Sequence, residues 1–404
     1  MDRIALLSDD VILKILSFVP TKVAVTTSLL SKRWRYLWKH VPKLWYHDPC
    51  NDSEHRKASR FVDKFLLFHE APVLETLLLI LCRNCPPTDI ETWIRIAISR
   101  GVRNLQITRY LHRSATIFPD LDPVPLPRSL YTCETLVTLN LEADFTVNDV
   151  PLTICFRSLK VLTLIFLRFS SHDPVHRILS GCPVLEELRL VRGRIDYVKS
   201  LTISVPSLQR LIVLDDGVHV PKDDDVVFVI KAPSLKSLLI FSRCSRLCSL
   251  VKMPDLVKAE IKLKHGDSKK FMGCLTSTKQ LFLCLRPPMD SCPLGVFNQL
   301  VSLNLCACSL VWCRLILNHT PKLRVLGFGI KQAKLFASKA FQGCCISSVD
   351  VQTQWEQPSS VPQCLISSLE TVSWIDYKGT QAEKKVVMYL LENSGQLKTM
   401  AIRS

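Results

Sequence analysis

Apolar positions recur along most of the chain in a short pattern, Leu-x-x-Leu-x-Leu, in which x is mostly polar. An early copy begins at Leu74, and from Leu136 onward the first position of the pattern falls at residues 136, 159, 185, 208, 235, 256, 278, 300 and 323, so these nine copies lie 21 to 27 residues apart. Alternate residues of a strand face the same side of a sheet, so each copy predicts one short strand with one buried face. A single copy cannot bury its leucines alone, whereas stacked neighbours form a continuous core.

This period and pattern are typical of leucine-rich repeats. The Asn or Cys that usually follows the core is missing from most of these copies, and the spacing is uneven. The pattern therefore predicts an α/β protein whose central part, residues 72–352, is an irregular leucine-rich-repeat solenoid (a horseshoe) with uneven helices on its outer side.

The first 40 residues follow a helical pattern instead. The sequence Ser-Asp-Asp at 8–10 suits a helix start, because Ser8 can accept a hydrogen bond from a free backbone N–H and carboxylates favour the positive end of the helix dipole. Pro20 ends this helix, and residues 21–30 predict a short second one. The apolar positions of the first helix follow at i, i+3, i+4 and i+7 spacing: Ile12, Ile15, Leu16 and Val19.

Residues 28–41, "SLLSKRWRYLWKHV", predict a third helix and raise a question of function. Four Lys or Arg and three aromatic residues lie in these fourteen positions, which is one way to build a nucleic-acid-binding patch. At helical spacing, however, the large apolar residues fall on one stripe, with the cations largely outside it. We interpret that stripe as the core of the module: Leu30, Trp34, Leu37 and Trp38. Three short helices are too small to stand alone, so a partner or the adjacent repeats should complete the core.

Residues 1–49 as a whole resemble a plant F-box, most clearly in "DRI", "ILSFVPTK", "TSLLSKRWRYLW" and "VP". The resemblance implies docking of a Skp-type adaptor through apolar faces of the first helices. The family usually has proline where this chain has Ser8, which predicts weakened docking. The adaptor-binding residues implied by the resemblance are Leu7, Ile12, Ile15, Leu16, Val19, Pro20 and Val23.

Residues 50–71 are interpreted as a helical linker, and residues 353–404 resemble the plant FBD segment that follows F-box and leucine-rich repeats. The resemblance rests on Trp355, "VPQCLISSLE", "YKGT" and "YLLENSGQLK". Thr380 and Glu383 have the spacing of a capping box. The helix that follows should turn Val387, Leu390 and Leu391 inward, and "LETVSWI" and "LKTMAI" predict two further repeat strands.

The amino-acid composition and the absence of certain motifs exclude several classes of protein. Of the 404 residues, 48% are hydrophobic and 22% charged, which is ordinary for a globular chain. No apolar run reaches the 18 residues of a membrane span, so no membrane association is expected. The 17 cysteines are expected to be reduced thiols, and only Cys82 and Cys85 form a CxxC pair, so neither a metal nor another cofactor is expected. No catalytic motif is present, and we expect no enzyme activity.

The combination of an F-box-like head, repeats and an FBD-like tail implies a substrate-recognition subunit of an SCF-type cullin–RING ubiquitin ligase. Its partners would be the Skp-type adaptor, through it a cullin, and a protein substrate, and it would act in the cytoplasm, the nucleus or both. Two alternatives stay open. One is a non-ligase scaffold with a degenerate F-box; the other, favoured less, is a nucleic-acid-binding protein whose net charge of +16 attracts phosphate.

Overall fold

The computed structural model divides into two compact units, Met1–Leu185 and Glu186–Ser404. Helices and parallel strands alternate in both, so the protein is of the mixed α/β class. The structure describes residues 6–48, 57–82, 85–109, 122–147, 150–169, 173–193, 200–215, 226–242, 245–263, 271–285, 295–306, 310–329 and 355–403.

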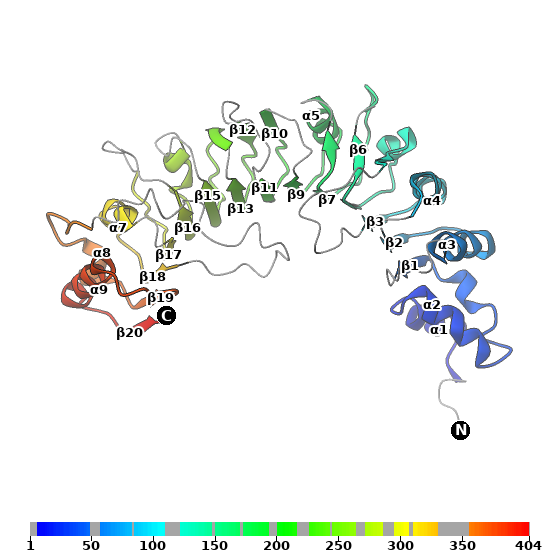
Figure 1. Cartoon of the computed structure of the whole chain (residues 1–404), viewed down its shortest axis with the longest axis horizontal. Helices are drawn as coiled ribbons and strands as arrows, with labels where there is room; N and C mark the ends of the chain where they lie inside the picture. Colours follow the sequence, from blue (N-terminus) through cyan, green and yellow to red (C-terminus); the bar gives the residue numbers. More distant parts are fainter. Residues whose placement is uncertain are drawn as a thin grey trace. The chain divides into compact units, whose positions relative to one another are not determined.

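The first unit contains one main sheet and one small sheet, and neighbouring strands in both are parallel (Figure 1). The main sheet has the order β1-β2-β3-β5-β7, with β1 Lys43–His47, β2 Thr76–Leu81, β3 Asn104–Arg109, β5 Thr138–Glu142 and β7 Val161–Ile165. The small sheet consists of β4 Val124–Pro125, β6 Phe145–Val147 and β8 Arg168–Phe169.

The helices of the first unit fall into an N-terminal group and a group that connects the strands. The N-terminal group is α1 Asp9–Leu16, α2 Thr21–Thr26 and the 3₁₀ turns η2 Thr27–Leu29 and η3 Leu37–His40. The connecting group is α3 Lys57–Phe68, α4 Pro87–Ser99, the 3₁₀ turn η4 Arg128–Thr132 and α5 Asp173–Ser180. Parallel strands need such crossover connections, since a two-residue turn cannot return the chain to the same end of the sheet.

The second unit repeats this arrangement. Its main sheet has the parallel order β9-β11-β13-β15-β16-β17-β18-β19-β20. These strands are β9 Glu187–Arg192, β11 Arg210–Asp215, β13 Ser237–Ser242, β15 Lys258–Leu263, β16 Gln280–Cys284, β17 Ser302–Leu305, β18 Val325–Phe328, β19 Thr371–Trp374 and β20 Thr399–Ile402. The remaining elements are a small sheet of β10 Ser200–Ser204, β12 Val226–Lys231 and β14 Ser245–Leu250, and the helices η5 Gly273–Leu275, α7 Leu310–Leu317, α8 Gln363–Ser367 and α9 Gln381–Asn393.

The strands confirm the repeat pattern with a constant offset. In all nine copies from Leu136 onward the strand begins two residues after the first position of the pattern, which is only 0–1% exposed. The two strands predicted in the C-terminal segment, β19 and β20, keep the same offset from Leu369 and Leu397. The copies therefore share one buried ladder of side chains within each unit.

Two strands, β1 and β3, belong to the same pattern but were not predicted. Each follows a valine, Val41 or Val102, in place of the first leucine, and both valines are buried. The β1 strand comes directly after the N-terminal helices and pairs with β2. The first repeat strand is therefore part of the segment that resembles an F-box.

The helix predicted in the tail forms, with one error of helix face, and the repeats also contain a helix with one buried side. In α5, Val175, Ile178 and Leu179 are buried. In α9 the capping box of Thr380 and Glu383 is present. The prediction that Val387 and Leu391 face inward is wrong, because the buried positions of α9 are Glu383, Val386, Tyr389 and Leu390, and Leu391 is 54% exposed.

The cysteines of the described residues are mostly buried free thiols, as expected for small apolar side chains. Burial raises the pKa of Cys85 and of Cys182 to about 12, which keeps both protonated. Cys82 departs from the expectation of reduced thiols, since it forms a disulfide. No helix in the described part of the chain is long and apolar enough to cross a membrane.

Candidate functional site

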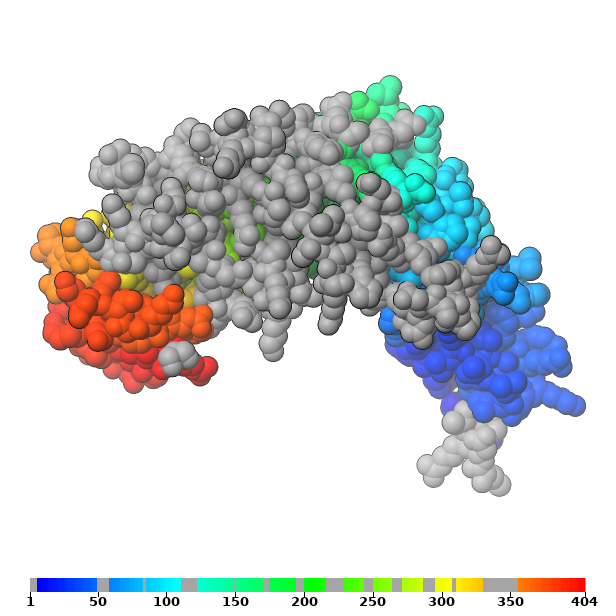
Figure 2. Space-filling model, viewed as in Figure 1, coloured from blue at the N-terminus to red at the C-terminus, as the bar shows by residue number. Residues whose placement is uncertain are grey.

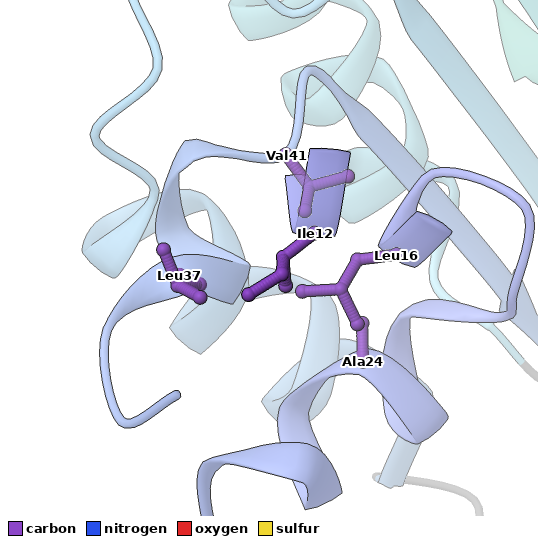
Figure 3. Close-up of a cluster of buried hydrophobic side chains, with 5 residues drawn as sticks. All are labelled: Ile12, Leu16, Ala24, Leu37 and Val41. Carbon is purple, nitrogen blue, oxygen red and sulfur yellow. The ribbon is translucent and has the colours of Figure 1, made fainter. Parts of the chain in front are cut away.

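The N-terminal helices enclose a small apolar core of their own (Figure 3). Its buried members come from both helices and from the chain that leads to β1: Ile12, Leu16, Ala24, Leu37 and Val41. Ile12 and Leu16 lie one turn apart and are 0% and 2% exposed. Leu7 and Val19 are partly buried against this core, which fixes α1 and α2 relative to each other.

The sequence-based assignment of Ile12 and Leu16 to an adaptor-binding surface is therefore corrected. Both side chains fill the module's own core and are covered before any partner arrives. On a helix, positions i and i+4 share one face, and this face of α1 is the inner one.

The outer face of α1 carries a second set of apolar residues. Val11 and Ile15 are 44% and 45% exposed, and Phe18, in the turn after α1, is 70% exposed. These three positions follow i, i+4 and i+7 spacing, so they form one stripe beside the buried one. Val23 of α2 is also exposed, at 47%. Of the residues predicted to bind the adaptor, Ile15 and Val23 are thus the most exposed, and Val11 and Phe18 are exposed apolar residues that the prediction did not include.

The predicted third helix does not form. Residues 32–36 are turns, followed by the 3₁₀ turn η3. Backbone bonds here span three residues, as from Trp34 N–H to the Ser31 carbonyl at 3.2 Å and from Leu30 N–H to the Thr27 carbonyl at 3.0 Å. A chain with three residues per turn loses the 3.6-residue stripe, and Leu30 is 69% exposed rather than part of the core.

The other three predicted core residues do pack inward. Leu37 is buried, and Trp34 and Trp38 are partly buried against the cluster of Ile12. Trp38 also contacts Phe65 of α3, with the ring centroids 5.9 Å apart. The adjacent repeat thus completes the core of the small module, as its size required.

The start of α1 is held by a distant arginine instead of the expected cap. Ser8 occupies the N-cap position with extended backbone, but its side chain makes no capping hydrogen bond. Arg33 donates to the Asp9 carboxylate, at 2.9 Å from Nε, and to the Leu7 carbonyl. The turn that contains Arg33 is therefore tied to the first residues of α1.

The N-terminal module is joined to the first repeat by several contacts. The Lys39 carbonyl accepts hydrogen bonds from the backbone N–H groups of Glu70 and Ala71 at 2.9 and 3.2 Å. The Thr21 hydroxyl accepts from the N–H of Trp45 in β1 at 2.8 Å, so α2 covers part of that edge strand. These bonds place the outer face of α1 at a defined position on the first unit.

Comparison with known proteins assigns each part of the chain. The F-box domain model matches residues 4–46, a model of the LRR repeats of the FBD-associated F-box protein At5g56370 matches residues 90–283, and the FBD model matches residues 357–402. The FBD-associated F-box protein At5g56440 of Arabidopsis thaliana is 71% identical over all of this chain and 93% of its own length. The F-box/FBD/LRR-repeat protein At4g26340 of the same plant is 40% identical over 99% of this chain and 92% of its own length.

The chain belongs to the F-box/FBD/LRR-repeat family. The core around Ile12 is thus the interior of its F-box, and the module is followed by the repeats and the FBD segment. Within the described residues no group of three or more His, Cys, Asp or Glu side chains could hold a metal ion.

A histidine lies at the joint between the F-box and the first repeat. His69 is 5% exposed; its Nε2 lies 2.9 Å from the Val41 carbonyl and its Nδ1 2.9 Å from the guanidinium of Arg100. A carbonyl can only accept and a guanidinium can only donate, so Nε2 carries the proton and Nδ1 has none. Burial lowers the pKa of His69, the bond to Val41 opposes this, and the charges of Arg100 and His40 lower it further.

This joint should make the stability of the F-box end depend on pH. Because the folded pKa of His69 lies below its usual value, the unfolded chain takes up a proton near pH 6.5 that the folded chain does not. Stability is then complete above that pH and falls as pH decreases toward the folded pKa. We expect the free energy of unfolding to fall between pH 7 and 5 with a slope of up to about 1.4 kcal/mol per pH unit.

The matched variant is His69→Gln, whose amide offers one donor and one acceptor but does not titrate. Urea unfolding at several pH values should show a shallower decline for His69→Gln than for the wild type. Equal slopes for the two proteins would contradict the assignment.

Proposed function

We propose that this protein is the substrate-recognition subunit of an SCF-type cullin–RING ubiquitin ligase. Its F-box binds a Skp-type adaptor, the adaptor connects it to a cullin, and the repeats hold a protein substrate near the ubiquitin donor. The protein itself contributes proximity rather than bond-making chemistry. It acts in the cytoplasm, the nucleus or both.

The observation that carries the proposal is the second apolar stripe of α1. An F-box whose core is already closed by Ile12 and Leu16 still exposes Val11, Ile15 and Phe18 to solvent. Exposed apolar side chains grouped on one face are typical of protein-binding surfaces. The docking surface therefore consists of residues that the module does not need for its own packing.

The repeats support the second half of the proposal. We propose that they continue as an irregular horseshoe-shaped solenoid, because neighbouring strands within each unit are parallel and in register. Each strand also presents a row of side chains on the face opposite the buried one, such as Gln106 and Asn140, which are paired neighbours on β3 and β5. Such a row of side chains can form a binding surface for a protein substrate.

The structure gives less support to the nucleic-acid alternative. In the basic stretch 28–41, Arg33 pairs with Asp9 at 2.7 Å and Lys39 with Glu70 at 2.6 Å. These two cations are already engaged by carboxylates of the same chain. The non-ligase scaffold with a degenerate F-box is tested by the experiment below.

The test is binding of the purified full chain to plant Skp-type adaptors, measured by co-purification and calorimetry. Phe18→Glu should weaken binding about thirtyfold or more, as loss of one interface hot spot does. Leu152→Glu is the matched control, because Leu152 is 90% exposed and lies outside the F-box. Failure of the wild type to bind any adaptor, with no rescue by Ser8→Pro, would favour the scaffold.

A further inference from the structure

A second exposed apolar surface lies where the F-box meets the first repeat. Leu67 and Phe68, at the end of α3, are 76% and 50% exposed, and Tyr36 of the F-box is 53% exposed. The ammonium of Lys39 lies 5.3 Å from the ring centroid of Tyr36 and 5.9 Å from that of Phe68. The two rings thus flank one side chain and belong to one patch. The F-box and α3 belong to the blue, N-terminal part of the chain in Figure 2.

The same patch is surrounded by cations. Arg60 and Lys64 are exposed. On α3, Lys64 lies one helical turn before Leu67 and Phe68, and Arg60 lies two turns before them, so all four share one side of the helix. Arg35 lies over the Tyr36 ring at 5.6 Å. Among the described residues, none of these three cations has a hydrogen bond or an ion pair. We call this surface the junction patch: Arg35, Tyr36, Lys39, Arg60, Lys64, Leu67 and Phe68.

The carboxylates near the patch are already engaged. Glu70 binds Lys39 at 2.6 Å and lies 3.6 Å from His40, and these contacts lower the pKa of Glu70. Asp63 accepts a hydrogen bond from the Trp93 indole at 2.7 Å. Glu70 is paired with Lys39, and Arg35, Arg60 and Lys64 outnumber Asp63, so the junction patch keeps positive charge beside exposed apolar side chains.

We propose that the junction patch binds an acidic amphipathic segment of a protein partner, separately from the adaptor. The apolar side chains of the segment cover Leu67 and Phe68, and its carboxylates pair with Arg35, Arg60 and Lys64. Charge complementarity selects the partner, and a bare aliphatic side chain such as Leu67 gains from apolar cover rather than from phosphate. Single-stranded nucleic acid fits less well, because the cations of Arg35 and Lys39 occupy the ring of Tyr36 on which a base would stack.

The test uses the full chain and three labelled probes in fluorescence anisotropy. The probes are an amphipathic helical peptide with a Leu/Phe face and Glu elsewhere, the same peptide with Lys in place of Glu, and a short single-stranded RNA. We expect binding of the acidic peptide alone, weakened about tenfold by Leu67→Glu and by Arg35→Glu. Leu152→Glu, at an exposed leucine outside the patch, should bind like the wild type.

The two patch variants lie on different elements, so a folding defect in one leaves the other informative. Their thermal midpoints should match the wild type, because both side chains are exposed. Equal binding of acidic and basic peptides, unchanged binding in both variants, no binding at all, or RNA binding that is lost in Arg35→Glu would overturn the proposal. Phe18→Glu should keep full peptide affinity, so failure of this proposal and failure of adaptor docking are separate results.

Discussion

Replacing Ile12 with alanine should destabilise the F-box by about 2–5 kcal/mol, whereas the same change at Ile15 should cost less than about 0.5 kcal/mol. Ile12 is fully buried among Leu16, Leu37 and Val41, so truncation leaves a cavity. Ile15 is one turn away and 45% exposed, so water fills the space that its side chain leaves. Unfolding by urea, followed by hydrogen exchange of residues 9–26, measures both effects.

Adaptor binding, unlike stability, should depend on the exposed Ile15. Ile15→Ala removes apolar contact area from the outer stripe and should weaken adaptor binding in a chain of normal stability. Ile12→Val is the control, because it keeps the shape of the core and should cost only about 0.5–1.5 kcal/mol. If Ile15→Ala destabilised the module as much as Ile12→Ala, the division into an inner and an outer stripe would be wrong.

The sequence could predict that α1 exists but not which of its apolar faces is inside. Residues 11, 15 and 18 and residues 12, 16 and 19 are both apolar and both helically spaced. Two such stripes on a helix of eight residues satisfy the same periodicity, and only the position of α2 and of the turn before β1 separates them. The assignment of Ile12 and Leu16 to docking followed from the resemblance and overlooked this ambiguity.

The third segment shows a different limit. Leu30, Trp34, Leu37 and Trp38 have helical spacing, yet a short helix is held mainly by tertiary packing. Here the contacts that decide are long-range: Arg33 with Asp9, and Trp38 with Phe65. Neither contact can be deduced from local sequence, so the stripe predicted three of the four core residues and placed Leu30 wrongly.

The repeat strands were predictable because their signal is local and repeated. A buried first position, two spacers and an alternating strand recur with the same offset, so each copy supports the others. Two strands of the same pattern that were missed, β1 and β3, come after Val41 and Val102, where the pattern lacks its leucine. Both strands pair with β2, and this pairing places them in the sheet although their own sequences lack the leucine.

Replacing Gly329 with alanine should destabilise the second unit by about 2–6 kcal/mol. Gly329 follows β18 with φ +98°, a conformation that costs an L-residue about 1–3 kcal/mol. A Cβ atom there would also lie 2.3 Å from the carbonyl oxygen of Ile375, which belongs to the FBD segment. Because the obstacle is backbone, the FBD strand itself must move, and overpacking adds about 1–3 kcal/mol.

Gly379→Ala provides the matched control for this prediction. Gly379 also has positive φ, at +70°, but its nearest neighbour to a new Cβ is the Tyr377 ring at 3.8 Å. The control should therefore show backbone strain alone, about 1–2 kcal/mol. In hydrogen exchange, Gly329→Ala should expose the Ile375 amide, which donates to the Phe328 carbonyl at 2.9 Å, and Gly379→Ala should leave it protected. Equal losses of stability in the two variants would mean that the close approach of the Ile375 backbone to Gly329 adds no cost beyond backbone strain.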